Sequence, residues 1–158
     1  MLAIDRDAVP STKPPTISCT CGHLRRASRA LTQLYDDAIA PAGLRITQFS
    51  LLRTLERQSP QRISALASLL LLDRTALSRT LEPLLERGLV EITPGRDART
   101  REVALTARGA AALRRAEPYW KRAQHDVARR VGQPRLDDLM SILGELEALH
   151  PDATAAAD

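Results

Sequence analysis

The chain has 158 residues, 44% of them apolar, which is typical of a single domain with enough apolar side chains to bury a core. Its net charge of +4 is too small by itself to indicate a nucleic-acid partner, because binding depends on where the charges cluster. The sequence has no apolar stretch long enough to cross a bilayer and no signal-peptide core, so we expect a cytoplasmic protein whose two cysteines do not form a disulfide framework.

Two helices are predicted in the N-terminal part. The first spans Thr20–Ile39, because apolar side chains repeat at near-heptad spacing, which favours packing against another helix: Leu24, Ala27, Leu31, Leu34 and Ala38. Pro41 and Gly43 should end it. The second should begin at the capping residue Thr47, stop at residues 59–60 and bury three side chains: Phe49, Leu52 and Leu55.

Two shorter helices separated by a turn are predicted next. Ser64 can cap a helix over residues 63–70 whose apolar side chains share one face: Leu66, Ala67 and Leu70. Asp73 can cap a following helix whose leucines recur at helical spacing: Leu77, Leu81, Leu84 and Leu85. Polar side chains on the rest of that helix suit the base edges and phosphates of a DNA major groove: Arg74, Thr75, Ser78 and Arg79.

A basic β-hairpin should follow. Gly88 should stop the helix, and residues 89–93 and Arg101–Leu105 alternate as two strands would. The connecting loop and its edge carry arginines that could reach a minor groove: Arg96, Arg99 and Arg101. Each piece alone is more often ordinary core or a solvated loop, but the order of the pieces predicts a winged helix-turn-helix.

The C-terminal part predicts two more helices. Thr106 can cap a long one that Pro118 should kink or divide, and its apolar side chains form a stripe: Leu113, Ala116, Trp120, Val127 and Val131. The last should run from about Arg135 and carries four leucines: Leu136, Leu139, Leu143 and Leu146. The first, penultimate and last helices have more apolar surface than the small winged helix-turn-helix alone can cover. We therefore expect them to pair two copies of the chain, although they could instead complete one monomeric core.

The elements together predict one domain over residues 19–150, mainly α-helical with a small β-wing. Residues 45–106 would form the DNA-binding part, and residues 19–44 and 107–150 would form the dimerisation helices. Two recognition helices about 34 to 36 Å apart would read successive major grooves, which predicts a pseudo-palindromic operator. The proline-containing residues 1–18 and the Ala-rich residues 151–158 are expected to be a flexible arm and tail.

Several short segments carry a more specific signature. They are residues 74–81 and 86–90, Asp97-Ala98-Arg99 at the wing tip, and Leu105-Thr106-Ala107-Arg108-Gly109 after it. Together these segments resemble the MarR family of bacterial transcriptional regulators.

The resemblance implies a homodimeric winged-helix regulator, most often a repressor. It implies that Arg99 enters the minor groove, that Asp97 braces the wing, and that Ser78 and Arg79 belong to the recognition helix. The sequence departs from the family pattern at Leu71, where Gly is common, and at Ile92, where Arg is common.

A regulatory signal is suggested by Cys19-Thr20-Cys21-Gly22-His23 at the start of the first helix. The helix dipole and two neighbouring arginines could favour a thiolate at Cys19 or Cys21 and make it prone to oxidation. Some MarR-like regulators sense oxidants through a cysteine near this helix, so redox release from DNA is one hypothesis. A soft metal held by Cys19, Cys21 and His23 is a weaker alternative, and ordinary thiols are the plainest one.

A small effector is the other possible signal. MarR-like proteins often bind phenolic ligands in a cleft between the dimerisation helices and the DNA-binding part. Most of the chain's aromatic residues fall on helices expected to border that cleft: Tyr35, Phe49, Tyr119 and Trp120. A packing role is the commoner one for such scarce aromatics.

Catalysis has little support in the sequence. There is no Gly-rich phosphate loop or recognisable nucleophile motif, the three histidines are scattered, and no cofactor is expected. A winged-helix module that binds a protein partner rather than DNA is the more serious alternative.

Overall fold

The computed structural model describes residues 19–95, 97 and 100–151. Within them the chain forms helices and a three-stranded antiparallel sheet in this order: α1 (Thr20–Ile39), η1 (Ala40–Ala42), α2 (Ile46–Gln58), β1 (Gln61–Arg62), α3 (Ile63–Leu69), α4 (Arg74–Glu86), β2 (Val90–Pro94), β3 (Arg101–Leu105), α5 (Ala107–Val131) and α6 (Gln133–Glu147). The predicted fold class is confirmed. The predicted arm, residues 1–18, and residues 152–158 of the tail lie outside the described residues.

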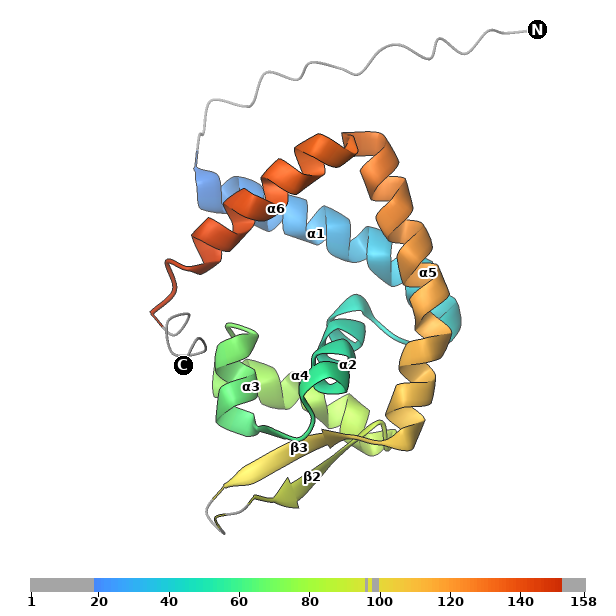
Figure 1. Cartoon of the computed structure of the whole chain (residues 1–158), viewed down its shortest axis with the longest axis vertical. Helices are drawn as coiled ribbons and strands as arrows, with labels where there is room; N and C mark the ends of the chain where they lie inside the picture. Colours follow the sequence, from blue (N-terminus) through green and yellow to red (C-terminus); the bar gives the residue numbers. More distant parts are fainter. Residues whose placement is uncertain (1–18, 96, 98–99, 152–158) are drawn as a thin grey trace, which may run out of the picture.

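The molecule has a head and a frame (Figure 1). The head consists of α2, α3, α4 and the sheet, and the frame consists of α1, α5 and α6. The long helix α5 runs from the sheet to α6 and packs against α1 and α2 on the way. Residues from both parts form one apolar core, to which α2 contributes Phe49, Leu52 and Leu55 and α5 contributes Leu113 and Ala116. No helix in the described ranges is long and apolar enough to span a membrane.

The sheet contains a strand that the sequence did not predict. Its order is β1-β3-β2, and β3 pairs with the predicted partner β2 through Val90 opposite Leu105 and Ile92 opposite Val103. The additional strand β1 has only two residues, with Arg62 opposite Glu102. The hydroxyl of Ser59, just before β1, accepts a hydrogen bond of 3.0 Å from the Leu105 amide. Two residues are too few to show the alternation by which strands are predicted.

Two predicted helix caps are confirmed and two are wrong. Asp73 accepts from the Ala76 amide at 2.8 Å, and Thr106 accepts from the Gly109 amide at 3.0 Å. Thr47 and Ser64 do not cap their helices, since both lie inside the first turn. The first amide of α2, that of Ile46, instead donates at 2.6 Å to Asp36 of α1. Helix α3 begins one residue before Ser64 because the chain leaves strand β1 at Arg62.

The C-terminal helices also differ in detail from the prediction. Helix α5 is continuous through Pro118 and is not divided there. A proline removes one intrahelical hydrogen bond, and the buried Ala116 and Ala123 on either side of it hold α5 against the rest of the molecule. Helix α6 begins at Gln133, two residues before the predicted start, because Gly132 adopts a positive φ of 89° and ends α5 there.

Thr106 ties the head to the frame where β3 leads into α5. Its hydroxyl donates to the carbonyl of Gly88 at 2.8 Å, and the Leu89 carbonyl lies 3.1 Å away. Its amide donates to the same Leu89 carbonyl at 3.2 Å. Gly109 packs so closely on that carbonyl that a Cβ atom would lie 2.0 Å from the oxygen. The start of β2 and the first turn of α5 are therefore held as one unit.

Candidate nucleic-acid interface

Helix α4 has one buried face and one exposed polar face. The predicted leucines Leu77, Leu81 and Leu84 are at most 3% exposed and fix the helix on the core. The four polar side chains predicted to face DNA are all exposed: Arg74, Thr75, Ser78 and Arg79. Ser78 donates to the Arg74 carbonyl at 2.8 Å, which leaves the lone pairs of its hydroxyl oxygen accessible. Neither guanidinium of this face forms an ion pair with another described residue.

The wing is described at its base and only in part at its tip. Gly95 donates to the Thr100 carbonyl at 2.9 Å, and the Thr100 amide and hydroxyl both donate to the Asp97 carbonyl at 2.8 Å. Asp97 thus closes the loop through its main chain, and its predicted side-chain role stays a prediction. Arg101 is exposed at the start of β3. The predicted groove contacts Arg96 and Arg99 lie outside the described residues.

A hollow of about 500 Å³, lined by both polar and apolar side chains, lies between α3, the start of α4 and the base of the wing. Three arginines line it, two of which the sequence had indicated as DNA contacts: Arg62, Arg74 and Arg101. The hydroxyls of Ser64 and Ser68 also line it, and Asp73 contributes one carboxylate. Guanidinium and hydroxyl groups are the usual partners of phosphate oxygens in protein–DNA interfaces. The hollow can therefore hold an anionic group beside the exposed face of α4.

Arg62 was not among the site residues predicted from the sequence. Arg62 lies on β1, and its pairing with Glu102 places it beside Arg101 in the sheet. In the sequence, Arg62 is marked only by its position directly before α3, which does not indicate that it lies beside the wing. Its place in the hollow depends on the pairing of β1 with β3, which are distant in the sequence.

The two cysteines lie at the start of α1, as predicted. Cys19 is the residue before the helix and Cys21 is in its first turn, and both are exposed free thiols. The ring of His23 contacts the guanidinium of Arg26, with His23 Nδ1 3.1 Å from Arg26 Nη2. No group of three potential metal ligands comes together among the described residues, and the metal site at Cys19, Cys21 and His23 stays a prediction.

The four aromatic residues predicted to border an effector cleft have different surroundings. Phe49 is 1% exposed and stacks on Trp120 with ring centroids 5.6 Å apart. The Arg53 guanidinium lies 4.4 Å from the Trp120 centroid and covers this pair. The hydroxyl of Tyr35 donates to Gln124, and burial raises the pKa of Tyr35. Tyr119 lines a groove of about 340 Å³ between α1 and α5.

The frame leaves much apolar surface uncovered. Helix α6 has no buried residue, and Met140 and Ile142 are 61% and 53% exposed. On α1, the predicted stripe is exposed or half-buried, with Leu31 40% exposed. The frame therefore has an unpartnered apolar face of the kind predicted for pairing two copies.

Comparison with known proteins identifies the family. The sequence model of the MarR family matches residues 44–100. The transcriptional regulator MosR of M. tuberculosis, in a crystal structure with DNA, is 41% identical, with a TM-score of 0.72 over 81% of this chain and 95% of that chain. The transcriptional repressor CouR bound to a 23-mer DNA duplex is 27% identical, with a TM-score of 0.74 over 81% of this chain and 92% of that one.

CouR bound to p-coumaroyl-CoA is 25% identical, with a TM-score of 0.73 over 84% of this chain and 94% of that one. A mutant MarR of E. coli complexed with operator DNA shares the fold, with 23% identity and a TM-score of 0.72 over 79% of this chain and 91% of that one. No curated protein sequence gives a significant match. Because the alignment with MosR spans nearly the whole length of that regulator at 41% identity, the chain is a member of the MarR family of transcriptional regulators.

Proposed function

We propose that the chain is a sequence-specific DNA-binding regulator that acts in the cytoplasm as a homodimeric repressor of a pseudo-palindromic operator. One observation carries the proposal: the exposed polar face of α4 lies beside a hollow lined by three arginines. Sequence similarity to MosR and CouR, which were solved with DNA, supports it. No catalytic activity is proposed.

The exposed side chains divide naturally between base edges and phosphates. Helix α4 would enter the major groove, where Thr75, Ser78 and Arg79 can reach base edges. Arg62, Arg74 and Arg101 would meet the phosphates beside it, fixing the register of the helix. Arg96 and Arg99 at the wing tip are proposed to enter the adjacent minor groove.

Dimerisation follows from the uncovered face of the frame. Burial of Leu31, Met140 and Ile142 against a second copy would remove apolar surface that a lone chain leaves in water. A two-fold pair would present two α4 helices to successive major grooves on one face of the DNA. Each head of the dimer would therefore bind one of the two half-sites of the operator.

Release from DNA is proposed to follow thiol oxidation, with a small ligand as the alternative signal. Exposed thiols on Cys19 and Cys21 at the end of a frame helix support the first. A peroxide would oxidise one thiol to a sulfenic acid and release water, and attack by a second thiol would release another water and leave a disulfide. Binding of p-coumaroyl-CoA by the relative CouR supports the second.

A titration of the purified protein against its own promoter DNA tests the proposal. The titration is made at fixed salt, first under reducing conditions and again after mild oxidation. Tight, salt-sensitive binding that is lost on oxidation is expected. Tight binding unaffected by oxidant would turn the search to a small ligand. Absence of binding would contradict the proposal and favour a winged-helix module that binds a protein partner.

The double substitution Cys19→Ser and Cys21→Ser is expected to abolish release by peroxide while leaving binding under reducing conditions unchanged. Serine keeps the size of the side chain but cannot form a disulfide. The measurement is the operator dissociation constant before and after peroxide, with recovery by a thiol reductant in the parent protein. Thr20→Ser, which changes the residue between the thiols, is the matched control and should respond like the parent. A double variant that still leaves the DNA on oxidation would show that the switch lies elsewhere.

A further inference from the structure

The turn between α3 and α4 contains a leucine in a backbone conformation that favours glycine. Leu71 has a φ of 49° and is the only non-glycine residue with positive φ in the described part of the chain. Its amide donates to the Ser68 carbonyl at 3.1 Å, and the Leu72 amide donates to the Ala67 carbonyl at 2.9 Å. These two bonds form a Schellman motif, whose left-handed position is usually glycine because a Cβ atom is disfavoured there. A leucine at this position needs a compensating contact.

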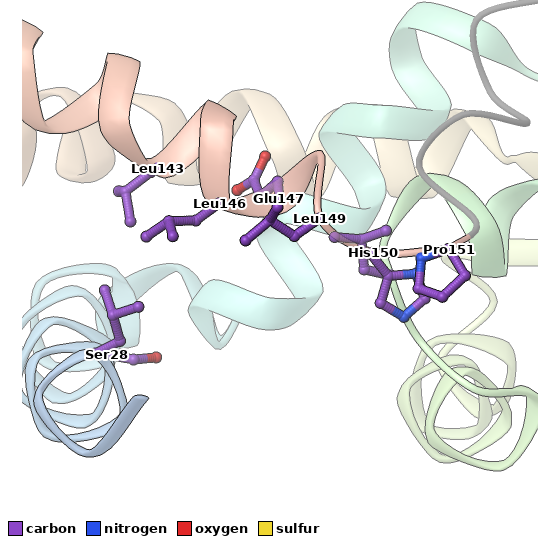
Figure 2. Close-up of a pocket in the computed structure, with 9 residues that line it drawn as sticks. Ser28, Leu143, Leu146, Glu147, Leu149, His150 and Pro151 are labelled. Carbon is purple, nitrogen blue, oxygen red and sulfur yellow. The ribbon is translucent and has the colours of Figure 1, made fainter. Parts of the chain in front are cut away.

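The side chain of Leu71 faces an apolar groove of about 550 Å³. Leu24 and Ser28 of α1 line one side of the groove, and Leu143 and Leu146 of α6 line the other. Figure 2 shows Ser28 across from these two leucines, with Leu149 and His150 continuing the groove past the end of α6. The groove therefore joins the frame helices to the turn that precedes α4.

The groove continues into the uncovered face of the frame. Leu149, which lines it just past the end of α6, is 78% exposed, and Met140 and Ile142 within α6 are 61% and 53% exposed. The same C-terminal segment thus supplies both the groove and exposed apolar side chains, which mark a site for another protein surface, here the surface proposed to pair two copies. The occupant that this continuity favours is a second copy of the chain.

We propose that the second copy fills this groove and packs against Leu71, so that dimer formation holds the turn that positions α4. The inference rests on the proposed function. Leu71 lies two residues before Asp73, whose carboxylate caps α4 at the Ala76 amide, and three before Arg74. A change in the partner's contact with Leu71 therefore shifts the start of the recognition helix. Leu71 is a positioning residue and touches no DNA itself.

The test compares matched substitutions at Leu71 and Leu69 in the full-length protein. Leu71→Asn keeps a residue that tolerates the left-handed conformation, so its effect does not come from added backbone strain. Leu71→Gly removes the side chain and relieves the strain, which keeps the test valid if the asparagine variant folds poorly. Leu69→Asn is the control, because Leu69 is 41% exposed at the end of α3, two residues before Leu71, but does not line the groove.

Three quantities are measured for each variant: the thermal midpoint, the dimer dissociation constant by sedimentation, and the operator dissociation constant with the dimer saturated. Both Leu71 variants are expected to raise the dimer constant by about tenfold or more, from the burial lost when a leucine leaves an apolar contact. Both should also weaken operator binding by the saturated dimer. The Leu69 control should change neither constant.

Equal constants for the Leu71 variants and the control would overturn the inference. A weaker dimer that binds the operator normally once saturated would overturn the coupling to α4. A small apolar molecule retained by the purified protein, detected by native mass spectrometry and displaced in the Leu71 variants, would overturn the second copy as occupant. If the parent protein does not bind its promoter, the proposed function fails, and the dimer constants still decide whether Leu71 meets the partner.

Discussion

Replacing Gly109 with alanine is expected to destabilise the protein by about 3 kcal/mol, through overpacking against a backbone that cannot move. The added Cβ atom would lie 2.0 Å from the Leu89 carbonyl oxygen and 2.7 Å from Cδ1 of Leu105. That carbonyl accepts a hydrogen bond from the Thr106 amide, so relief of the clash must break this bond or displace α5. The measurement is the free energy of unfolding from denaturant titration.

Gly22→Ala is the matched control for this substitution. Gly22 also lies in a helix, but its added Cβ atom would meet its nearest neighbour, Cβ of Cys19, at 3.7 Å, an ordinary contact. The control should therefore be neutral or stabilising by about 0.5–1 kcal/mol, the usual gain from glycine to alanine within a helix. A Gly109 variant as stable as the control would contradict the close packing of α5 on the start of β2.

The double substitution Arg74→Ala and Arg79→Ala is expected to weaken operator binding by about 4 kcal/mol or more. A homodimer loses four guanidiniums, and each such contact contributes about 1–3 kcal/mol. Both side chains are exposed and have no acidic partner among the described residues, so their removal should leave the stability of the fold nearly unchanged. Operator titrations at several salt concentrations should also show a shallower salt dependence, since fewer phosphates are neutralised.

A second double variant with the same loss of charge provides the control. Lys121 and Arg129 are exposed on α5 and pair with Glu117 and Asp126 at 3.0 and 2.9 Å. Exposed pairs of this kind contribute little to stability, so Lys121→Ala with Arg129→Ala should fold normally. It should bind the operator nearly as well as the parent. If both double variants lose affinity equally, net charge rather than the face of α4 accounts for binding.

The sequence predicted those elements whose pattern is contained in a single segment. The apolar repeat of α1 predicted the extent of that helix. Asp73 and the leucines after it predicted the start, the buried face and the exposed face of α4. In these cases spacing along one helix decides which side chains share a face. The exposed side of the recognition helix was therefore available from the sequence alone.

Features that depend on a second segment were missed. The first amide of α2 donates to Asp36 of α1, a contact that the sequence around Thr47 does not indicate. Arg62 joins the hollow only because a two-residue strand pairs with β3. The stacking of Phe49 on Trp120 likewise joins two different helices, and no spacing within one segment indicates it.

The hydrogen bonds of Thr106 fix the position of the hairpin relative to α5. Because the start of β2 and the first turn of α5 are bonded to the same residue, the two cannot rotate independently about their junction. The hairpin extends away from this junction (Figure 1), so a rotation of α5 would displace the pair Pro94 and Arg101, at the far ends of the two strands, by more than it displaces the junction. In a symmetric pair, the separation of the two hairpins would therefore depend on the angle between the paired α5 helices.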